Sequence, residues 1–118
     1  MDGKSKALCV TYGVISAGAL LATWSQNIAF FTTPDNGGLG GFLRDAGVNA
    51  AARSIGYDLG FLCVAAFVWM VVEARRVGLR HVWIYIVLSC LIAISVMFPL
   101  FLLARQIRLA AASPPARA

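Results

Sequence analysis

Three long apolar runs decide what this chain can fold into. They cover residues 7–31, 55–72 and 82–104, and each is close to the ~20 apolar residues that cross a ~30 Å hydrocarbon core as a helix. Of the 118 residues, 60% are hydrophobic and 13% are charged, which is more apolar content than a single soluble core requires. The sequence therefore predicts an integral membrane protein.

The predicted fold class is all-α, a membrane bundle of three transmembrane helices in a single domain over residues 1–118. Inside hydrocarbon each backbone group must be satisfied within its own segment, which a helix achieves. The runs are continuously apolar and lack the alternation of a barrel strand. The tail, residues 105–118, has too little apolar content to fold, and we expect it to be mobile.

The first run also has features of a cleavable secretion signal. Lys4 and Lys6 precede it, and Ala17 and Ala19 have the spacing of a cleavage site. The apolar stretch continues to about Trp24, however, which is longer than the apolar region of a typical signal peptide. We therefore expect an uncleaved first helix.

The segments between and within the runs contain residues that break helices. Residues 32–41, with the sequence TTPDNGGLGG, are typical of a turn-rich loop. Residues 39–53 place apolar side chains at helical spacing, which predicts either a short amphipathic helix in the membrane interface or an early extension of the second helix. In the third run, Pro99 cannot donate to the carbonyl of Ser95, so we expect a kink there.

The sequence predicts a polar pocket near one membrane surface. Asp58 lies about one turn inside the second apolar segment, and an ionisable group inside a span is costly without a partner. In a bundle of three full crossings, the first helix ends, the second begins and the third ends on the same side. We therefore predict a binding site formed by Asn27, Ser54, Asp58 and Arg105. The alternative is structural, with these groups paired to one another or with Asp58 reaching headgroup water.

A second group of residues predicts contact between helices. Ala52, Gly56 and Gly60 follow one another at four-residue intervals, and small residues at this spacing let two membrane helices approach closely. Asp58 falls on roughly the opposite face, because two residues turn a helix by about 200°. One face of the second helix is therefore expected to pack against another helix while the other face lines the polar pocket.

The connection between the second and third runs is short and basic. Glu73 and Arg76 have the i, i+3 spacing of a helical ion pair. A solvated turn that faces the lipid headgroups accounts for this composition, and the sharper interpretation is recognition of anionic lipid or of a partner subunit. The residues predicted for that contact are Arg75, Arg76, Arg80 and His81.

No metal site or cofactor is predicted, although a bound lipid or pigment is compatible with the sequence. Cys9, Cys63 and Cys90 are scattered and form no C-x-x-C pair, and His81 is the only histidine. The chain lacks the motifs of serine hydrolases, zinc proteases and phosphate-binding loops. Its net charge of +5 comes from residues at the ends of the apolar runs, which indicates membrane anchoring rather than nucleic-acid binding.

Several short motifs resemble those of a known family. They are Asp58, Glu73 with Arg76, Gly78, Trp83 with Tyr85, Pro99-Leu-Phe-Leu, and Arg105. This pattern resembles a bacterial family of small integral membrane proteins that is catalogued as a domain of unknown function. The resemblance implies a membrane bundle of three or four helices from a bacterium, and it assigns no reaction, ligand or partner.

The two sides of a three-span bundle would carry equal numbers of basic residues. The side of the N-terminus holds Lys4, Lys6, Arg75, Arg76 and Arg80, and the other side holds Arg44, Arg53, Arg105, Arg108 and Arg117. Because the first helix usually dominates orientation, we expect a cytoplasmic N-terminus and a location in the bacterial inner membrane.

Three spans of ordinary length enclose little cavity, and their small residues suit helix docking. We therefore predict a small structural or accessory subunit of a membrane protein complex, in contact with lipid and with other subunits or a second copy. The alternative is a membrane enzyme or binder for a lipid or isoprenoid, with Asp58 as acid or base and Asn27 and Arg105 orienting a headgroup. A third hypothesis is one protomer of an oligomeric transporter or channel, since three spans cannot form the two equal halves of a complete transporter.

Overall fold

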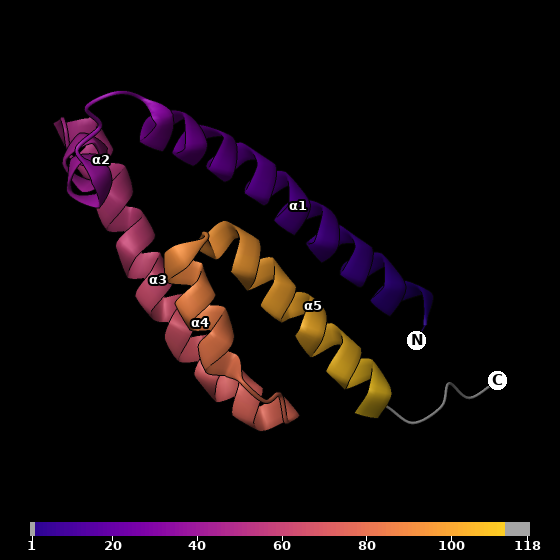
Figure 1. Ribbon diagram of the computed structural model, residues 1–118. Coiled ribbons are helices and arrows are strands. Elements are labelled where there is room, and N and C mark those ends of the chain that lie inside the picture. The colour runs from indigo at the N-terminus through magenta and orange to yellow at the C-terminus, as the bar shows by residue number, and fades with distance from the viewer. Residues whose placement is uncertain (1, 113–118) are drawn as a thin grey trace.

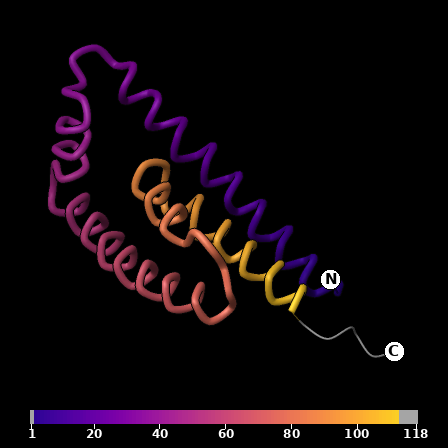
Figure 2. The backbone as a smooth tube through the Cα atoms, turned by 60° about the horizontal axis from the view of Figure 1, so that its bottom comes forward, coloured from indigo at the N-terminus to yellow at the C-terminus, as the bar shows by residue number. Residues whose placement is uncertain are grey.

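The computed structural model describes residues 2–112, which form five helices and no strand (Figure 1). The helices are α1 (Gly3–Thr32), α2 (Gly38–Ala46), α3 (Ala50–Val77), α4 (Val82–Leu91) and α5 (Ile94–Ala112). The predicted all-α class is confirmed in this part of the chain, and α1, α3 and α5 are each long and apolar enough to cross a membrane. α1 and α3 form two arms joined at one end through α2, and α4 and α5 lie between the arms (Figures 1 and 2).

α1 contains the first predicted span and extends beyond it at both ends. It begins after Asp2, whose Oδ1 accepts a hydrogen bond from the backbone N–H of Ser5 at 2.7 Å. This bond caps the helix and lowers the pKa of the Asp2 carboxyl. At 30 residues the helix is about 45 Å long, which is enough to place both of its ends in the interfacial regions of a bilayer.

A short turn leads from α1 into α2, which packs against the end of α1. The rings of Phe30, Phe31 and Phe42 form a cluster with centroid separations of 5.1, 5.3 and 5.7 Å. Gly41 is required at this close approach, because a Cβ there would collide with the backbone O of Asn36. The short helix predicted between the first two spans is therefore present, and α3 begins separately after it.

α3 contains the second predicted span, 55–72, and is longer at both ends. The side chain of Asn49 accepts a hydrogen bond from the N–H of Ala52 at 2.8 Å and caps the start of the helix. Gly78 ends the helix with a φ of 78°, which a residue without a Cβ adopts at little cost. The helix is buried only in its second half, at Ala66, Met70, Glu73 and Ala74.

The third predicted span is not one continuous helix, so the expectation of a single helix over 82–104 is wrong. The chain breaks at Ile92 and Ala93, between α4 and α5, whereas Pro99, where a kink was expected, lies inside α5. α4 and α5 therefore form a helical hairpin, and we call Ile92 and Ala93 the hairpin tip. α5 continues to Ala112, so the first part of the predicted mobile tail is helical, and residues 113–118 lie outside the described part of the chain.

Side chains of α1 hydrogen-bond to backbone carbonyls beside the hairpin tip. A break in a helix leaves the last carbonyls before the break, here that of Ile92, without partners in the same helix, and such groups are costly in hydrocarbon. Trp24 Nε1 donates to the carbonyl O of Ile92 at 3.1 Å, and Ser16 Oγ donates to the carbonyl O of Val96 at 2.7 Å. Ser16 is buried, with 4% of its surface exposed. These two contacts fix the hairpin against α1.

Replacing Ser16 with alanine is expected to lower the free energy of unfolding by about 1 kcal/mol, because the Val96 carbonyl loses a buried donor. Ser25→Ala is the matched control, since the Ser25 hydroxyl is exposed and donates only within its own helix, to the carbonyl of Ala22. Unfolding by SDS titration in mild detergent measures both variants. Equal losses in the two would contradict a stabilising role for the Ser16 contact.

The hairpin returns the chain to the end of the molecule at which it began. α5 runs antiparallel to α1, and near its end Gln106 Nε2 donates to Ser5 Oγ at 2.9 Å. Figures 1 and 2 show the start of α1 and the end of α5 together, with α2 at the opposite end. We call these the terminal end and the α2 end. The prediction that the third span ends beside the start of the second is therefore wrong.

The core lies between the second half of α3 and the hairpin. Met70, Ala74 and Phe101 are buried there, with at most 1% exposure. Trp69 and Tyr85 pack edge-to-face on Phe101, with ring centroids 5.9 and 5.6 Å away, a geometry that aromatic pairs favour. α5 is the helix that contacts α1, α3 and α4, so it holds the two arms together.

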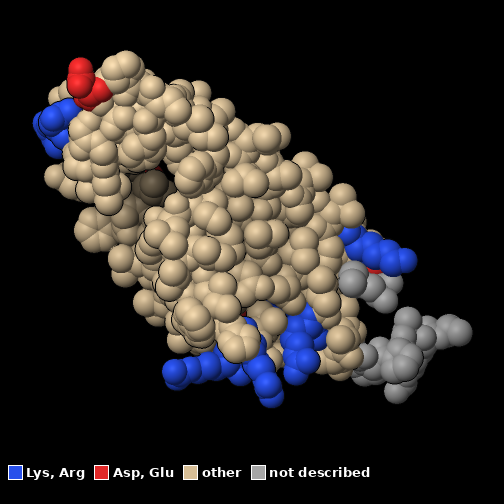
Figure 3. Space-filling view, viewed as in Figure 1, with Lys and Arg blue, Asp and Glu red and all other residues tan. Residues whose placement is uncertain are grey.

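Charged side chains gather at the two ends of the molecule, and the middle of the face shown in Figure 3 is uncharged. Of the nine lysines and arginines among residues 2–112, two lie towards the α2 end, Arg44 and Arg53. The other seven lie at the terminal end and are Lys4, Lys6, Arg75, Arg76, Arg80, Arg105 and Arg108. An apolar middle between charged ends is the pattern of a chain that crosses a bilayer.

Candidate functional site

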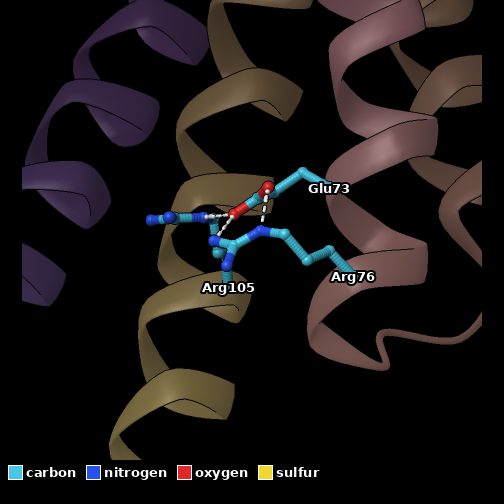
Figure 4. Close-up of polar contacts among 3 residues, drawn as sticks. All are labelled: Glu73, Arg76 and Arg105. Carbon is cyan, nitrogen blue, oxygen red and sulfur yellow. Dashed lines mark hydrogen bonds and ion pairs between the residues drawn. The ribbon is translucent and has the colours of Figure 1, made fainter.

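A buried carboxylate at the terminal end joins α3 to α5 (Figure 4). Glu73 is 6% exposed, and its Oε1 accepts hydrogen bonds from Arg105 Nε and Arg76 Nη2, each at 2.6 Å. Its Oε2 accepts from Arg76 Nε at 2.9 Å. Arg76 lies three residues away on the same helix, whereas Arg105 comes from α5. We call these three residues the Glu73 cluster.

Neighbouring contacts hold Arg105 and the end of α3 in place. The Arg105 guanidinium lies 5.7 Å from the centroid of the Trp69 ring, which is within the range of a cation–π contact. Arg108 Nε donates to the backbone O of Val77 at 3.2 Å, at a helix C-terminus where the helix dipole favours a cation. A Cβ at Gly78 would lie 3.2 Å from Arg108 Nη2, so this glycine also makes room for the arginine.

The Glu73 cluster is suited to holding helices together rather than to acid–base chemistry. Both carboxylate oxygens accept charge-assisted hydrogen bonds, which are stronger than neutral ones. A carboxylate with both oxygens engaged is a poor proton acceptor for a substrate, because a general base must reach the proton that it removes. We therefore interpret the cluster as an ion-pair lock between α3 and α5.

The structure does not bring the four predicted pocket residues together. Arg105 pairs with Glu73, which lies about 22 Å further along α3 than Asp58, so the expected proximity of Arg105 to Asp58 is wrong. The cause is the hairpin, which directs α5 to the terminal end. Asp58 and Ser54 are exposed on α3 and make no hydrogen bond or ion pair within residues 2–112. Asn27 lines a separate cleft, and a binding role for these three residues stays a prediction.

The small residues predicted for helix packing lie on an uncovered stripe of α3. Ala52, Gly56 and Gly60 share a face with Phe67, because seven residues advance a helix by almost two turns. Phe67 packs against the core, but α4 has only ten residues and the hairpin does not reach the first half of α3. Cβ atoms placed on Gly56 and Gly60 would meet no atom within 4 Å. The stripe of Ala52, Gly56 and Gly60 therefore has no partner helix within the described chain.

The basic residues of the connection fall into two groups. The predicted i, i+3 pair of Glu73 and Arg76 is confirmed, although sequence reasoning missed Arg105 as the second partner of Glu73. Arg75, Arg80 and His81 are exposed at the terminal end, and their contact with headgroups or a partner stays a prediction. The pairing with Arg105 follows from the hairpin, for which the sequence carries no local signal.

Two clefts adjoin the hairpin tip. One, of about 450 Å³, lies between α1, α3 and α5 and is almost wholly apolar. The other, of about 470 Å³, lies towards the α2 end and is lined by α1, α2, α3 and the hairpin tip, with the polar side chains of Thr23 and Asn27 on its α1 wall. We call the second one the α2-side cleft. Leu59, Ile94 and Ser95 line both clefts.

Comparison with known proteins assigns the chain to a family but does not assign it a biochemical activity. Within residues 2–112, no three His, Cys, Asp or Glu side chains are placed to hold a metal ion. A search of curated proteins and a search of solved structures each found no match. A family model described as "Protein of unknown function DUF2834" matches residues 11–107, which confirms the resemblance to an uncharacterised domain. Because this match covers most of the chain, including the Glu73 cluster and most of the hairpin, the protein belongs to the family DUF2834.

Proposed function

We propose that the protein is a small structural or accessory subunit that packs through its transmembrane helices against another membrane protein. The observation that carries this proposal is the uncovered stripe of Ala52, Gly56 and Gly60. A glycine inside a helix costs about 1 kcal/mol relative to alanine, and in a membrane this cost is offset where two helix backbones approach closely. Because the described chain does not use the stripe, we assign it to a helix of a partner subunit.

The position of Asp58 favours the presence of a partner subunit beside the first half of α3. Its carboxylate is exposed and unpaired within residues 2–112, on roughly the opposite face from Gly56 and Gly60. A carboxylate on the lipid-facing surface of a span is costly, and such groups usually have a partner. A subunit that supplies a hydrogen-bond donor on this side of α3 would remove that cost.

We also propose that both ends of the described chain face the cytoplasm, in the inner membrane of a bacterium. Seven of the nine described lysines and arginines lie at the terminal end, and cytoplasmic segments carry an excess of such residues. The sequence alone divides the basic residues equally between the two sides. The hairpin changes this division, because it moves Arg105 and Arg108 to the side of the N-terminus.

Replacing both Gly56 and Gly60 with leucine is expected to abolish the association. Two leucines would hold the partner backbone away from α3, whereas the fold of the chain itself should survive, because added Cβ atoms there meet no atom within 4 Å. The protein is extracted in gentle detergent, the mass of the extracted particle is measured, and its components are identified by mass spectrometry. We expect a heavier particle from the unmodified protein and a single chain from the variant.

Gly18→Leu is the matched control for this test. Gly18 also lies in a long apolar helix, with no atom within 4 Å of an added Cβ, but it is not on the α3 stripe. We expect its particle mass to equal that of the unmodified protein. If the Gly56→Leu/Gly60→Leu double variant gave a particle of the same mass as the unmodified protein, the proposal would be contradicted. Identification of the associated chain shows whether the partner is a second copy of this chain or a different subunit.

The alternative was a membrane enzyme or binder that acts on a lipid or isoprenoid through one pocket of Asn27, Asp58 and Arg105, and the positions of these residues do not support that pocket. It required Arg105 to share a pocket with Asp58 and Asn27, and Arg105 is instead engaged with Glu73. Asp58 does not line either of the clefts at the hairpin tip. We therefore keep the structural or accessory subunit as the proposed function.

A further inference from the structure

The hairpin stops short of the α2 end and leaves a space between the two arms. Trp24 of α1 reaches the carbonyl of Ile92 at the tip, and α1 continues for eight more residues to Thr32, a rise of about 12 Å. α3 also extends past the tip towards its start at Ala50. Figures 1 and 2 show only the α2 region joining the arms there, and Figure 3 shows a hollow between them.

The α2-side cleft occupies this space. Its volume of about 470 Å³ is within the range of ligand sites in proteins, but it equals only about one turn of a helix 10 Å across. A thin, flexible chain therefore fits the cleft better than a second helix does. Most of its lining is apolar, from Phe31 and Phe42 near α2 to Leu59 of α3 and Ile92 at the tip.

Two polar side chains that line the cleft, Asn27 and Ser95, make no hydrogen bond within residues 2–112, and Asn27 is the one on the α1 wall. It lies about 7 Å before the end of α1 at Thr32. A helix of about 45 Å centred in a ~30 Å hydrocarbon core protrudes by about that distance at each end. Asn27 is thus level with the boundary between hydrocarbon and headgroups, where the ester carbonyls of glycerophospholipids lie.

We propose that the α2-side cleft holds one acyl chain of a glycerophospholipid from the leaflet at the α2 end. The ester carbonyl accepts a hydrogen bond from the Asn27 amide, and the chain runs inward along Leu59 to the hairpin tip. No Asp, Glu, Lys or Arg lines the cleft, so the group that it recognises is neutral. An unfilled cleft in a bilayer would forfeit dispersion contacts along its walls, whereas an acyl chain supplies them.

Native mass spectrometry of the whole chain, purified in mild detergent with palmitoyl-oleoyl phosphatidylglycerol, tests the site. We expect one retained phospholipid for each chain. Cys63 lines the cleft from α3 and is half-buried, so Cys63→Phe should fill it and weaken lipid retention at least tenfold. Asn27→Leu leaves the cleft open but removes the amide that donates to the ester carbonyl. We expect retention of the phospholipid to fall about two- to tenfold, which corresponds to the loss of one hydrogen bond.

Val64→Phe is the matched control, because Val64 is the next residue, is 62% exposed and does not line the cleft. It should retain lipid like the unmodified protein, and helicity measured by circular dichroism checks that each variant folds. Unchanged retention in both Cys63→Phe and Asn27→Leu would overturn the proposal, as would retention of added oleic acid in place of the phospholipid. This test measures bound lipid rather than companion chains, so its outcome can be told apart from that of the association test.

Discussion

Thiols introduced at the start of α1 and near the end of α5 are expected to react with a membrane-impermeant maleimide from the same side of the membrane. The probes are Lys4→Cys and Arg108→Cys, each in a chain without Cys9, Cys63 and Cys90. Both positions lie at the terminal end, because the hairpin reverses the chain before it crosses completely. In intact, oriented membranes, we expect both thiols to be labelled from one side and neither to be labelled from the other.

Asp35→Cys supplies the contrast for this experiment. Asp35 lies in the turn between α1 and α2, and its thiol should react only from the side opposite to Lys4. A chain that crossed three times completely would place position 108 with position 35. Labelling of positions 35 and 108 from one side, with position 4 on the other, would therefore contradict the hairpin and the proposed cytoplasmic location of both ends of the described chain.

The parts of the fold that the sequence predicts well are those that local chemistry determines. The first two apolar runs lie inside α1 and α3, because an uninterrupted apolar segment of this length is satisfied only as a helix. The ends of α3 also have local signals, since Asn49 is a favoured N-cap and Gly78 a favoured residue just after a helix. The small-residue stripe is visible in the sequence for the same reason, as its period is that of the helix.

The break in the third run has no such signal. No glycine, proline, asparagine or aspartate occurs between Val82 and Phe98, so the sequence predicts one continuous helix over this run. The proline of the run, Pro99, lies inside α5 and not at the break. The stabilising contacts at the break come from α1, through Ser16 and Trp24. Residues 68 and 80 positions apart in the sequence give no pattern that a single sequence reveals.

This one missed feature accounts for the incorrect part of the predicted site. With the hairpin in place, Arg105 moves from the level of Asp58 to that of Glu73, and a supposed pocket residue becomes part of an interhelical lock. The α2-side cleft has the same origin, because the space exists only where the hairpin ends early. The sequence predicts Asn27 as a polar residue near one membrane surface, but it does not predict the residues that form the cleft around it.

Glu73→Gln is expected to be among the most destabilising single substitutions in this chain. Glutamine keeps the size of the side chain but leaves the guanidinium groups of Arg76 and Arg105 without a negative partner, and breaking a buried pair costs far more than the pair itself contributes. We expect the apparent melting temperature in mild detergent to fall by roughly 5–10 °C. Circular dichroism at 222 nm during heating measures this fall.

The two arginines of the cluster should differ, and their order tests whether the cluster locks α3 to α5. The Arg76 side chain is 62% exposed and pairs within its own helix, whereas the Arg105 side chain is 24% exposed and joins two helices. Exposed pairs within a helix contribute little, so Arg105→Gln should lower the melting temperature much more than Arg76→Gln. The double variant Glu73→Leu with Arg105→Leu should recover part of the loss, because apolar side chains can replace a buried ion pair without leaving a charge unpaired. Equal effects of the two arginine variants, or no recovery in the double variant, would show that the two helices are held by the apolar core alone.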